Sequence, residues 1–215
     1  MKGLLLTNYY LVYRSFITYT GLAILVSGLI FYFGDTSMHR FVAMLTILFV
    51  AMPALEVIKY EGKSGYDKYV LTLPVSRRDV VQSHYFFYFI IVIIGTLLSY
   101  GIFHAYGLVS GTPIDGIFKI VSFGTFIVLF AGAIVYPLLY IFGPEKSDTI
   151  VIGGAVGGLF ATFGLQGLVV YLIEQLPLSN LNIDLYVQIL YIIFGVIIYI
   201  ISFFIAAFIY LKKEF

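Results

Sequence analysis

Long apolar runs, separated by short polar segments, make up most of the chain. Six of these runs are long enough to cross the hydrocarbon core of a membrane as helices, which takes about 20 residues. The six predicted spans cover residues 16–33, 41–57, 85–105, 117–142, 149–173 and 186–211. Because the runs are continuous, the pattern does not fit the alternating strands of a membrane barrel. We therefore predict an all-α integral membrane protein, with one transmembrane domain over residues 1–215.

The composition agrees with this prediction and excludes several functions. Of the 215 residues, 61% are apolar and 11% are charged, against about a quarter charged in soluble domains. No polar stretch approaches the roughly 100 residues of a folded soluble domain, so we expect no ATPase or other enzyme in this chain. With no cysteine and no cluster of metal-ligand or catalytic residues, we expect no metal and no cofactor. The net charge of +1 does not suggest a nucleic-acid partner.

The distribution of Lys and Arg predicts the orientation, because cytoplasmic connections of membrane proteins are enriched in these residues. If the N-terminus is cytoplasmic, ten of the twelve lie on the inside. These ten are Lys2, Arg14, Lys59, Lys63, Lys68, Arg77, Arg78, Lys146, Lys212 and Lys213. The outside set is Arg40 and Lys119. We therefore expect both termini in the cytoplasm.

The first 15 residues allow two interpretations. They could form a separate helix along the inner membrane surface, because Thr7, Asn8 and Arg14 cluster on a helical wheel. Leu4 and Leu11 fall within the same cluster, however, so the segment could equally be an extended start of the first span. We do not expect a cleavable signal peptide, because Arg14 interrupts the apolar run and no small-residue cleavage site follows.

The longest polar segment covers residues 58–84, between the second and third spans. Ser76 and Asp79 have the spacing of a capping box, which predicts that a short cytoplasmic helix begins there. One side of this helix would carry Val80, Val81, His84 and Tyr85. We expect Arg77 and Arg78 to remain available to a partner or to lipid phosphates. The alternative is a solvated, positively charged loop that only anchors the protein.

Small residues and prolines mark further features of the spans. The predicted fifth span contains two overlapping small-xxx-small pairs, formed by Gly153, Gly154, Gly157 and Gly158. Such pairs let helices approach closely, which suits packing within the chain, a dimer interface or the lining of a pathway. Pro53 and Pro137 lie inside the second and fourth spans, where each removes a backbone hydrogen bond and favours a kink.

In the polar segment the sequence resembles the permease subunits of ABC type 2 transporters. The matching motifs are the acidic-basic start Glu61-Gly62-Lys63 and the core Leu73-Pro74-Val75-Ser76-Arg77. His84 stands where these permeases usually carry a lysine. The chain also resembles the family in its length, its six predicted spans, its expected cytoplasmic termini and its lack of an ATPase domain.

The resemblance implies a bacterial plasma-membrane permease that forms a homodimer, or a heterodimer with a paralogue. A separate cytoplasmic ABC ATPase subunit would bind ATP and magnesium and would dock on a coupling helix between spans two and three. The implied docking residues are Pro74, Ser76, Arg77, Arg78, Asp79, Val80, Val81 and His84. With 21 Phe and 19 Tyr, the chain is most similar to permeases of phenol-soluble modulin exporters, which implies export of amphipathic peptides.

A second function class remains open. The substrate-binding membrane subunit of an energy-coupling-factor vitamin importer has a similar size, often has six spans and also lacks an ATPase. The stretch 21–28 offers no clear Ala-xxx-Ala face of the kind such subunits use, and the longest polar segment is on the predicted inside. A membrane enzyme is disfavoured by the lack of a catalytic cluster, and a channel by the lack of a filter-like segment.

Overall fold

The structure is a computed structural model that describes residues 2–35, 38–111, 114, 116–174 and 183–213. It does not describe the side chains of residues 71, 162, 163, 166, 168–170, 172–174, 183 and 184. The described residues form helices and no strands, as predicted. The helices are α1 (Lys2–Phe33), α2 (His39–Ser64), α3 (Tyr66–Tyr69), η2 (Val70–Thr72), α4 (Arg77–Ser110), α5 (Ile117–Phe142), η3 (Pro144–Lys146), α6 (Ser147–Glu174) and α7 (Ile183–Lys212).

Five helices in the described part of the chain are long and apolar enough to cross a membrane. They are Lys2–Phe33, His39–Ser64, Arg77–Ser110, Ile117–Phe142 and Leu185–Lys212. The chain is therefore a multi-pass membrane protein. The predicted span 149–173 lies on α6, which is helical but is not among the five, so the sixth span remains a prediction.

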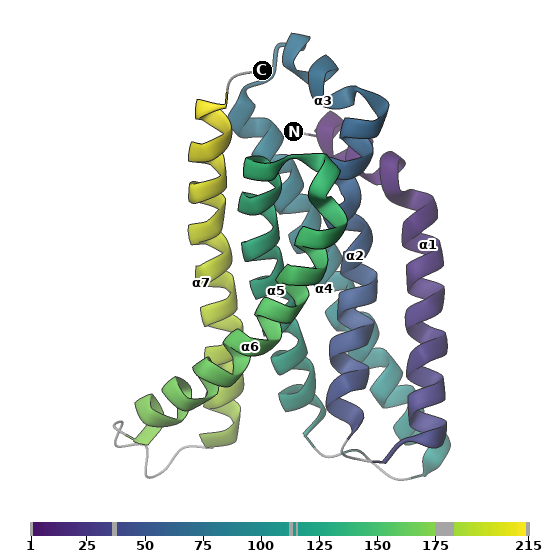
Figure 1. The fold of residues 1–215 in the computed structure, drawn as a ribbon. Coiled ribbons are helices and arrows are strands. Elements are labelled where there is room, and N and C mark those ends of the chain that lie inside the picture. Colours follow the sequence, from purple (N-terminus) through teal and green to yellow (C-terminus); the bar gives the residue numbers. More distant parts are fainter. Residues whose placement is uncertain (1, 36–37, 112–113, 115, 175–182, 214–215) are drawn as a thin grey trace.

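The long helices form a bundle in which α5 is central (Figure 1). α5 packs against α2, α4, α6 and α7, whereas α1 packs mainly against α2 and α4. The start of α1, the short helix α3 and the end of α7 all lie at one end of the bundle, which we name the α3 end (Figure 1). The connection between α5 and α6 also lies at this end, so four parts of the chain meet there.

Glycines bring the central helices close together. A Cβ atom at Gly95 would lie 3.3 Å from Val50, and one at Gly195 would lie 3.2 Å from Phe126. These contacts join α4 to α2 and α7 to α5. Close approach of this kind is how helices pack in membranes, where the hydrophobic effect does not drive them together.

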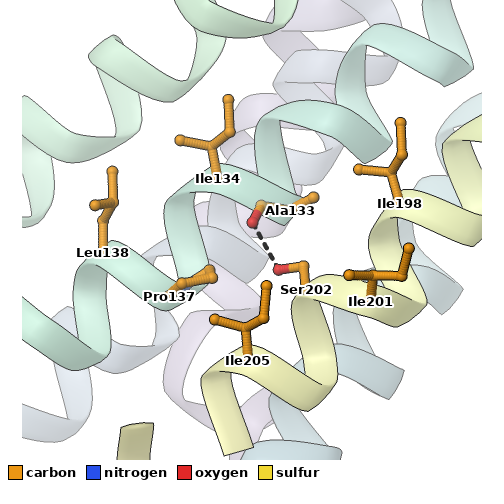
Figure 2. A pocket seen from close by; sticks show the side chains of 8 residues that line it. All are labelled: Ala133, Ile134, Pro137, Leu138, Ile198, Ile201, Ser202 and Ile205. Atoms are coloured by element: carbon orange, nitrogen blue, oxygen red, sulfur yellow. Dashed lines mark hydrogen bonds between the residues drawn. The ribbon is translucent and has the colours of Figure 1, made fainter.

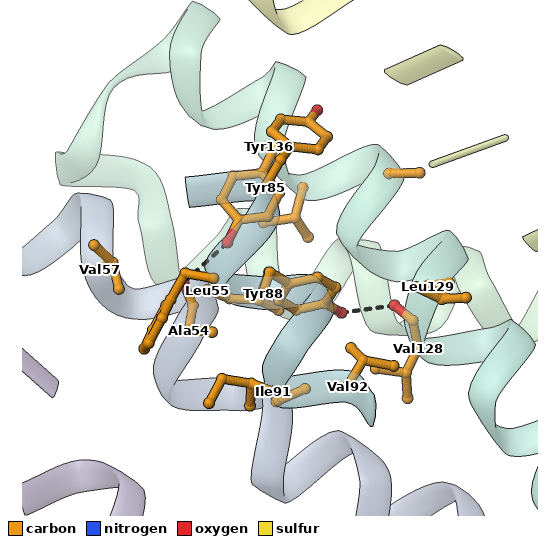
Figure 3. Packing of buried hydrophobic residues seen from close by; sticks show 14 of the residues in the cluster. Ala54, Leu55, Val57, Tyr85, Tyr88, Ile91, Val92, Val128, Leu129 and Tyr136 are labelled. Atoms are coloured by element: carbon orange, nitrogen blue, oxygen red, sulfur yellow. Dashed lines mark hydrogen bonds between the residues drawn. The ribbon is translucent and has the colours of Figure 1, made fainter. Parts of the chain in front are cut away.

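The core of the bundle contains buried tyrosines whose hydroxyl groups are hydrogen-bonded (Figure 3). Tyr88 donates to the carbonyl of Val128 at 2.6 Å, and Tyr136 donates to the carbonyl of Ala54 at 3.0 Å. A Cβ atom at Gly132 would overlap the ring of Tyr88, so the glycine makes room for this ring. Because a buried hydroxyl without a partner is costly, these bonds allow large aromatic side chains to join α2, α4 and α5.

A helix begins after Ser76 as predicted, but the prediction that this helix is short is wrong. The helix that begins at Arg77 continues without a break to Ser110, so it is the start of the third long helix, which was predicted to begin at Tyr85. The physical reason is the sequence between Arg77 and Gly95, which contains no Pro or Gly to end a helix. Its apolar side is buried in the bundle from the first turns onward.

The start of α1 can also be compared with the two interpretations above. α1 is one continuous helix from Lys2 to Phe33, so its first 15 residues do not form a separate helix. At about 1.5 Å per residue it is roughly 48 Å long, which exceeds the roughly 30 Å apolar core of a membrane. Leu4, Asn8 and Val12 are buried against the bundle, which shows that the first turns belong to the packed structure.

Candidate functional site

The connection between α2 and α4 is folded onto the α3 end of the bundle. α2 ends at Gly65, which has a positive φ of 72° and closes the helix in the left-handed conformation. The short helices α3 and η2 follow, and Leu73 then has an extended backbone. Val70 is 1% exposed, and Leu73 and Val75 pack against the same apolar core. The connection is therefore anchored by apolar side chains and is not a fully solvated loop.

The predicted capping box at the start of α4 is confirmed. The Ser76 hydroxyl oxygen accepts a hydrogen bond from the Asp79 backbone N–H at 3.1 Å. The Asp79 carboxylate in turn accepts from the Ser76 backbone N–H at 3.2 Å and from the Ser76 hydroxyl at 2.6 Å. These bonds satisfy N–H groups that the first turn of a helix leaves without a partner.

The first turns of α4 have a buried side and an exposed side. The buried side contains Val80, Val81, His84 and Tyr85, the residues predicted to share one face. The exposed side contains Arg78, Gln82 and Phe86, which follow one another at intervals of four residues. Among the eight implied docking residues, Pro74, Ser76 and Arg78 are exposed, and Arg77 and Asp79 are half-buried. Val80, Val81 and His84 instead pack inside the chain.

Arg77 is engaged within the chain, so the expectation that it stays available to a partner is wrong. One of its guanidinium nitrogens donates to the carbonyl of Lys213 at 2.7 Å and to the carbonyl of Leu211 at 3.4 Å. Carbonyl groups at the end of a helix lack intrahelical partners and carry partial negative charge. Arg77 therefore caps the end of α7 and joins it to the beginning of α4.

A buried polar cluster, formed by Glu61, His84 and Tyr140, lies beneath this surface. The Nε2 atom of His84 lies 3.1 Å from a carboxylate oxygen of Glu61, and the two side chains are 2% and 6% exposed. This is an ion-pair distance, although Nε2 has hydrogen-bond geometry to none of the described groups. The Nδ1 atom of His84 lies 2.7 Å from the Tyr140 hydroxyl. The cluster joins α2, α4 and α5.

Sequence reasoning did not find this cluster. It noted Glu61 as part of a motif and His84 as an unusual residue, but it did not pair them. The signal available in the sequence was their position, because Glu61 lies near the beginning of the polar segment 58–84 and His84 ends it. In the described part of the chain, no group of three or more His, Asp or Glu residues is placed to hold a metal ion.

Further hydrogen bonds fix the buried side of α4 to its neighbours. Asn8 of α1 donates to the Ser83 hydroxyl at 3.4 Å. Tyr199 of α7 donates to the backbone carbonyl of Tyr85 at 2.9 Å. The Tyr85 hydroxyl lies 2.8 Å from the hydroxyl of Ser202, also on α7. Together with the polar cluster, these bonds connect the first turns of α4 to α1, α2, α5 and α7.

The connection between α5 and α6 contacts the end of α2. Lys59 forms an ion pair with Asp148 in the first turn of α6. A Cβ atom at Gly62 would lie 2.6 Å from the Pro144 ring. Both contacts place η3 and the start of α6 beside the end of α2, next to the polar cluster.

The four glycines of the predicted small-xxx-small pairs lie on α6 and fall into two groups. A Cβ atom at Gly154 would overlap Val135, and one at Gly158 would lie 2.9 Å from the carbonyl of Ile127. These two glycines therefore allow α6 to pack closely on α5. Gly153 has no such neighbour within 4 Å, and Gly157 contacts only the end of a flexible side chain. Packing within the chain accounts for Gly154 and Gly158, while a subunit interface remains a prediction for Gly153.

The sequence was compared with known families, curated proteins and solved structures. The family model described as ABC-2 family transporter protein matches residues 3–211. No curated protein matches the chain, and no solved structure matches it. The matched range includes the capped start of α4, the polar cluster and all the long helices, and the family implies embedding in a membrane and pairing with an ABC ATPase. The chain belongs to the ABC-2 family of transporter proteins.

Proposed function

We propose that the chain is the permease subunit of an ATP-driven exporter, and that a separate cytoplasmic ATPase docks on the α3 end of the bundle. The docking area, which we name the coupling surface, consists of exposed residues on the α2–α4 connection and the first turns of α4. These residues are Lys68, Tyr69, Thr72, Pro74, Ser76, Arg78 and Gln82. The excess of Lys and Arg at this end supports its cytoplasmic location.

One observation carries the proposal: the coupling surface lies on a segment that is bonded on its inner side to four helices. The contacts of Ser83, His84 and Tyr85 reach α1, α2, α5 and α7. A displacement of this segment by a partner would therefore move several helices together instead of bending a loop. Such rigid-body movement of packed helices is a common form of conformational change, and it requires no catalytic residue in this chain.

The chemistry of the coupling surface suits a protein partner. Tyr69 is 59% exposed although it lies next to the buried Val70, and Arg78 is exposed in the first turn of α4. Tyrosine and arginine are frequent anchors of protein interfaces. Lys68 and Arg78 add positive charge, so we expect acidic residues on the ATPase.

A second permease copy, identical or a paralogue, would complete the pathway. The outer face of α6 supports this part of the proposal, because Ile152, Val156 and Phe160 are exposed beside the open Gly153. Amphipathic peptides or other amphiphiles would cross between the two copies, from the cytoplasm or the inner leaflet to the outside. This cargo class is supported by the resemblance to modulin exporters and by the apolar helix faces.

The docking experiment uses a variant that leaves the internal bonds intact. Arg77 and Asp79 are bonded within the chain, so we would change the exposed Tyr69 and Arg78, as Tyr69→Ala with Arg78→Glu. After co-expression with the ATPase, we expect at least tenfold less co-purified ATPase and loss of transport-coupled ATP hydrolysis. Unfolding in detergent should be unchanged, because both side chains are exposed.

The matched control is Lys2→Glu, which reverses an exposed positive charge at the same end of the bundle but outside the coupling surface. It should retain the ATPase. Normal assembly and hydrolysis in the Tyr69→Ala, Arg78→Glu variant would contradict the docking assignment. For the cargo, ATP hydrolysis should be measured with amphipathic peptides, lipids and a water-soluble vitamin in parallel. Stimulation by the vitamin alone would favour the importer alternative.

A further inference from the structure

An apolar groove lies between α5 and α7 on the outer surface of the bundle (Figure 2). Its volume is about 340 Å³. Bulky aliphatic side chains from the two helices form its walls, and Ala133, Pro137 and Ser202 lie between them (Figure 2). The wall residues are Ile134, Leu138, Ile198, Ile201 and Ile205.

The groove has no free hydrogen-bonding group among its side chains. Its one polar side chain, Ser202, donates its hydroxyl proton to the carbonyl of Ala133 at 2.6 Å. The oxygen of Ser202 also lies 2.8 Å from the Tyr85 hydroxyl, which must then be the donor. Pro137 carries no N–H group. The occupant of the groove itself must therefore be apolar.

The groove extends from the middle of α5 and α7 toward their ends at the α3 end of the bundle. Pro137 and Leu138 lie roughly one helical turn before the end of α5 at Phe142. Ile205 lies roughly two turns before the end of α7 at Lys212. A lipid whose acyl chain filled the groove would therefore have its head group level with these two helix ends.

Positive side chains lie at those helix ends. Lys212 follows Ile201, Ile205 and Phe208 on one face of α7, and its ammonium group lies 4.2 Å from the centre of the Phe208 ring. Lys146 follows α5 and lies 5.4 Å from the centre of the Phe142 ring.

Both lysines are exposed. Glu145 is an exposed acid beside Lys146, and Lys213 donates to the carbonyl of Tyr140 at 2.9 Å. Among these described side chains the positive charges therefore outnumber the negative one, and two of the lysines lie beside phenylalanine rings.

We propose that this groove binds one anionic phospholipid. One acyl chain occupies the space between α5 and α7, and the phosphate group is bound by Lys212, with Lys146 adding positive charge. The apolar lining selects the chain, and the lysines select the negative head group. The site does not depend on the coupling surface, because it faces the lipid between α5 and α7, and its failure would leave the ATPase proposal intact.

The test is lipid binding by the purified full chain in detergent, measured by native mass spectrometry. The probes are phosphatidylglycerol and phosphatidylcholine with identical acyl chains. A lysine near an anionic head group contributes about a fivefold difference in affinity. We therefore expect the unaltered chain to bind one phosphatidylglycerol about 25-fold more tightly than phosphatidylcholine. In Lys212→Gln this preference should fall to about fivefold. In the double variant Lys146→Gln, Lys212→Gln the two lipids should bind with nearly equal affinity.

Two matched controls separate the head group from the groove. The double variant Lys2→Gln, Arg14→Gln removes two exposed positive charges from α1 and should leave the preference unchanged. Ile201→Trp fills the groove and should lose both lipids, whereas Ile193→Trp, at an exposed position on α7 outside the groove, should retain them.

Equal binding of the two lipids by the unaltered chain would overturn the proposal. An unchanged preference after removal of both lysines would also overturn it. A third outcome would assign the groove to a second copy of the chain instead: dimer formation would displace the lipid, and Ile201→Trp would weaken the dimer.

Discussion

The buried and exposed sides of the first turns of α4 differ in their contacts with the rest of the bundle. On the buried side, His84 contacts Glu61 and Tyr140, and Tyr85 is bonded to α7 through its backbone and its hydroxyl group. On the exposed side, Arg78 and Gln82 face away from the bundle. The same three turns therefore combine a fixed attachment with a free surface.

This difference separates stability from docking. Single hydrogen bonds between membrane helices contribute only about 0.6 kcal/mol on average, so the attachment depends on several bonds acting together. Substitutions on the buried side should lower stability and change coupling together. Substitutions on the exposed side should affect only partner binding, because a surface side chain away from caps and ion pairs usually changes stability by less than about 0.5 kcal/mol.

The largest expected effect is at the polar cluster. His84→Leu removes the imidazole that lies 3.1 Å from the buried carboxyl group of Glu61 and 2.7 Å from the Tyr140 hydroxyl. Leaving buried polar groups without a partner costs about 1–3 kcal/mol each, and more where the group is charged. We expect the free energy of unfolding to fall by about that amount, measured by denaturant titration in detergent. Gln82→Leu, on the exposed side of the same helix, should change it by less than about 0.5 kcal/mol.

The double variant Glu61→Leu, His84→Leu tests whether the two residues act as a pair. Replacing both partners by apolar residues leaves neither side chain with a buried group that lacks its partner, and such replacements can be nearly neutral or stabilising. The double variant should therefore be more stable than either single variant. Costs that simply add would mean that Glu61 and His84 do not interact.

The next test is at Gly132 of α5, which makes room for the ring of Tyr88. Tyr88 lies on α4 about one helical turn after the buried residues His84 and Tyr85. In Gly132→Ala the new methyl group would overlap the Tyr88 ring, and overpacking of this kind costs about 1–3 kcal/mol. The matched control is Gly153→Ala, which meets no such neighbour within 4 Å and should be neutral or slightly stabilising through helix propensity. Equal stability of the two variants in thermal unfolding would contradict the packing around Tyr88.

Local signals predicted a large part of this structure. The capping box at Ser76 and Asp79 and the shared face of Val80 and His84 follow from spacing alone, because both depend on residues within two helical turns. The apolar runs also predicted each of the five helices in the described part of the chain that are long and apolar enough to cross a membrane. The family resemblance, based on the motif that ends at Arg77, was confirmed by the match over residues 3–211.

The points that the sequence did not predict are two contacts between separate helices and the length of one helix. Arg77 was expected to be available, but it caps α7 from a position far away in the sequence. Helix continuity from Arg77 to Ser110 was missed because a polar segment was equated with a separate element. The pairing of Glu61 with His84 depends on how α2 and α4 pack, which no spacing rule encodes.

The smallest expected effect concerns the bond by which α7 joins the buried side of α4. The amide of residue 137 would normally donate to the carbonyl of Ala133, but Pro137 has no N–H group. Ser202 donates to that carbonyl instead and accepts from Tyr85. Ser202→Ala should therefore lower stability by about 0.6–1.7 kcal/mol, the range for interhelical hydrogen bonds in membranes, as measured by denaturant titration.

Pro137→Ala supplies the control for this last prediction. An alanine at position 137 restores an N–H group, so the carbonyl of Ala133 regains a donor within its own helix. The cost of Ser202→Ala should then be clearly smaller in the Pro137→Ala background than in the unaltered chain. If the cost is the same in both backgrounds, Ser202 does not replace the donor that the proline lacks. The cost of Ser202→Ala would then reflect the loss of its hydrogen bond with Tyr85 of α4.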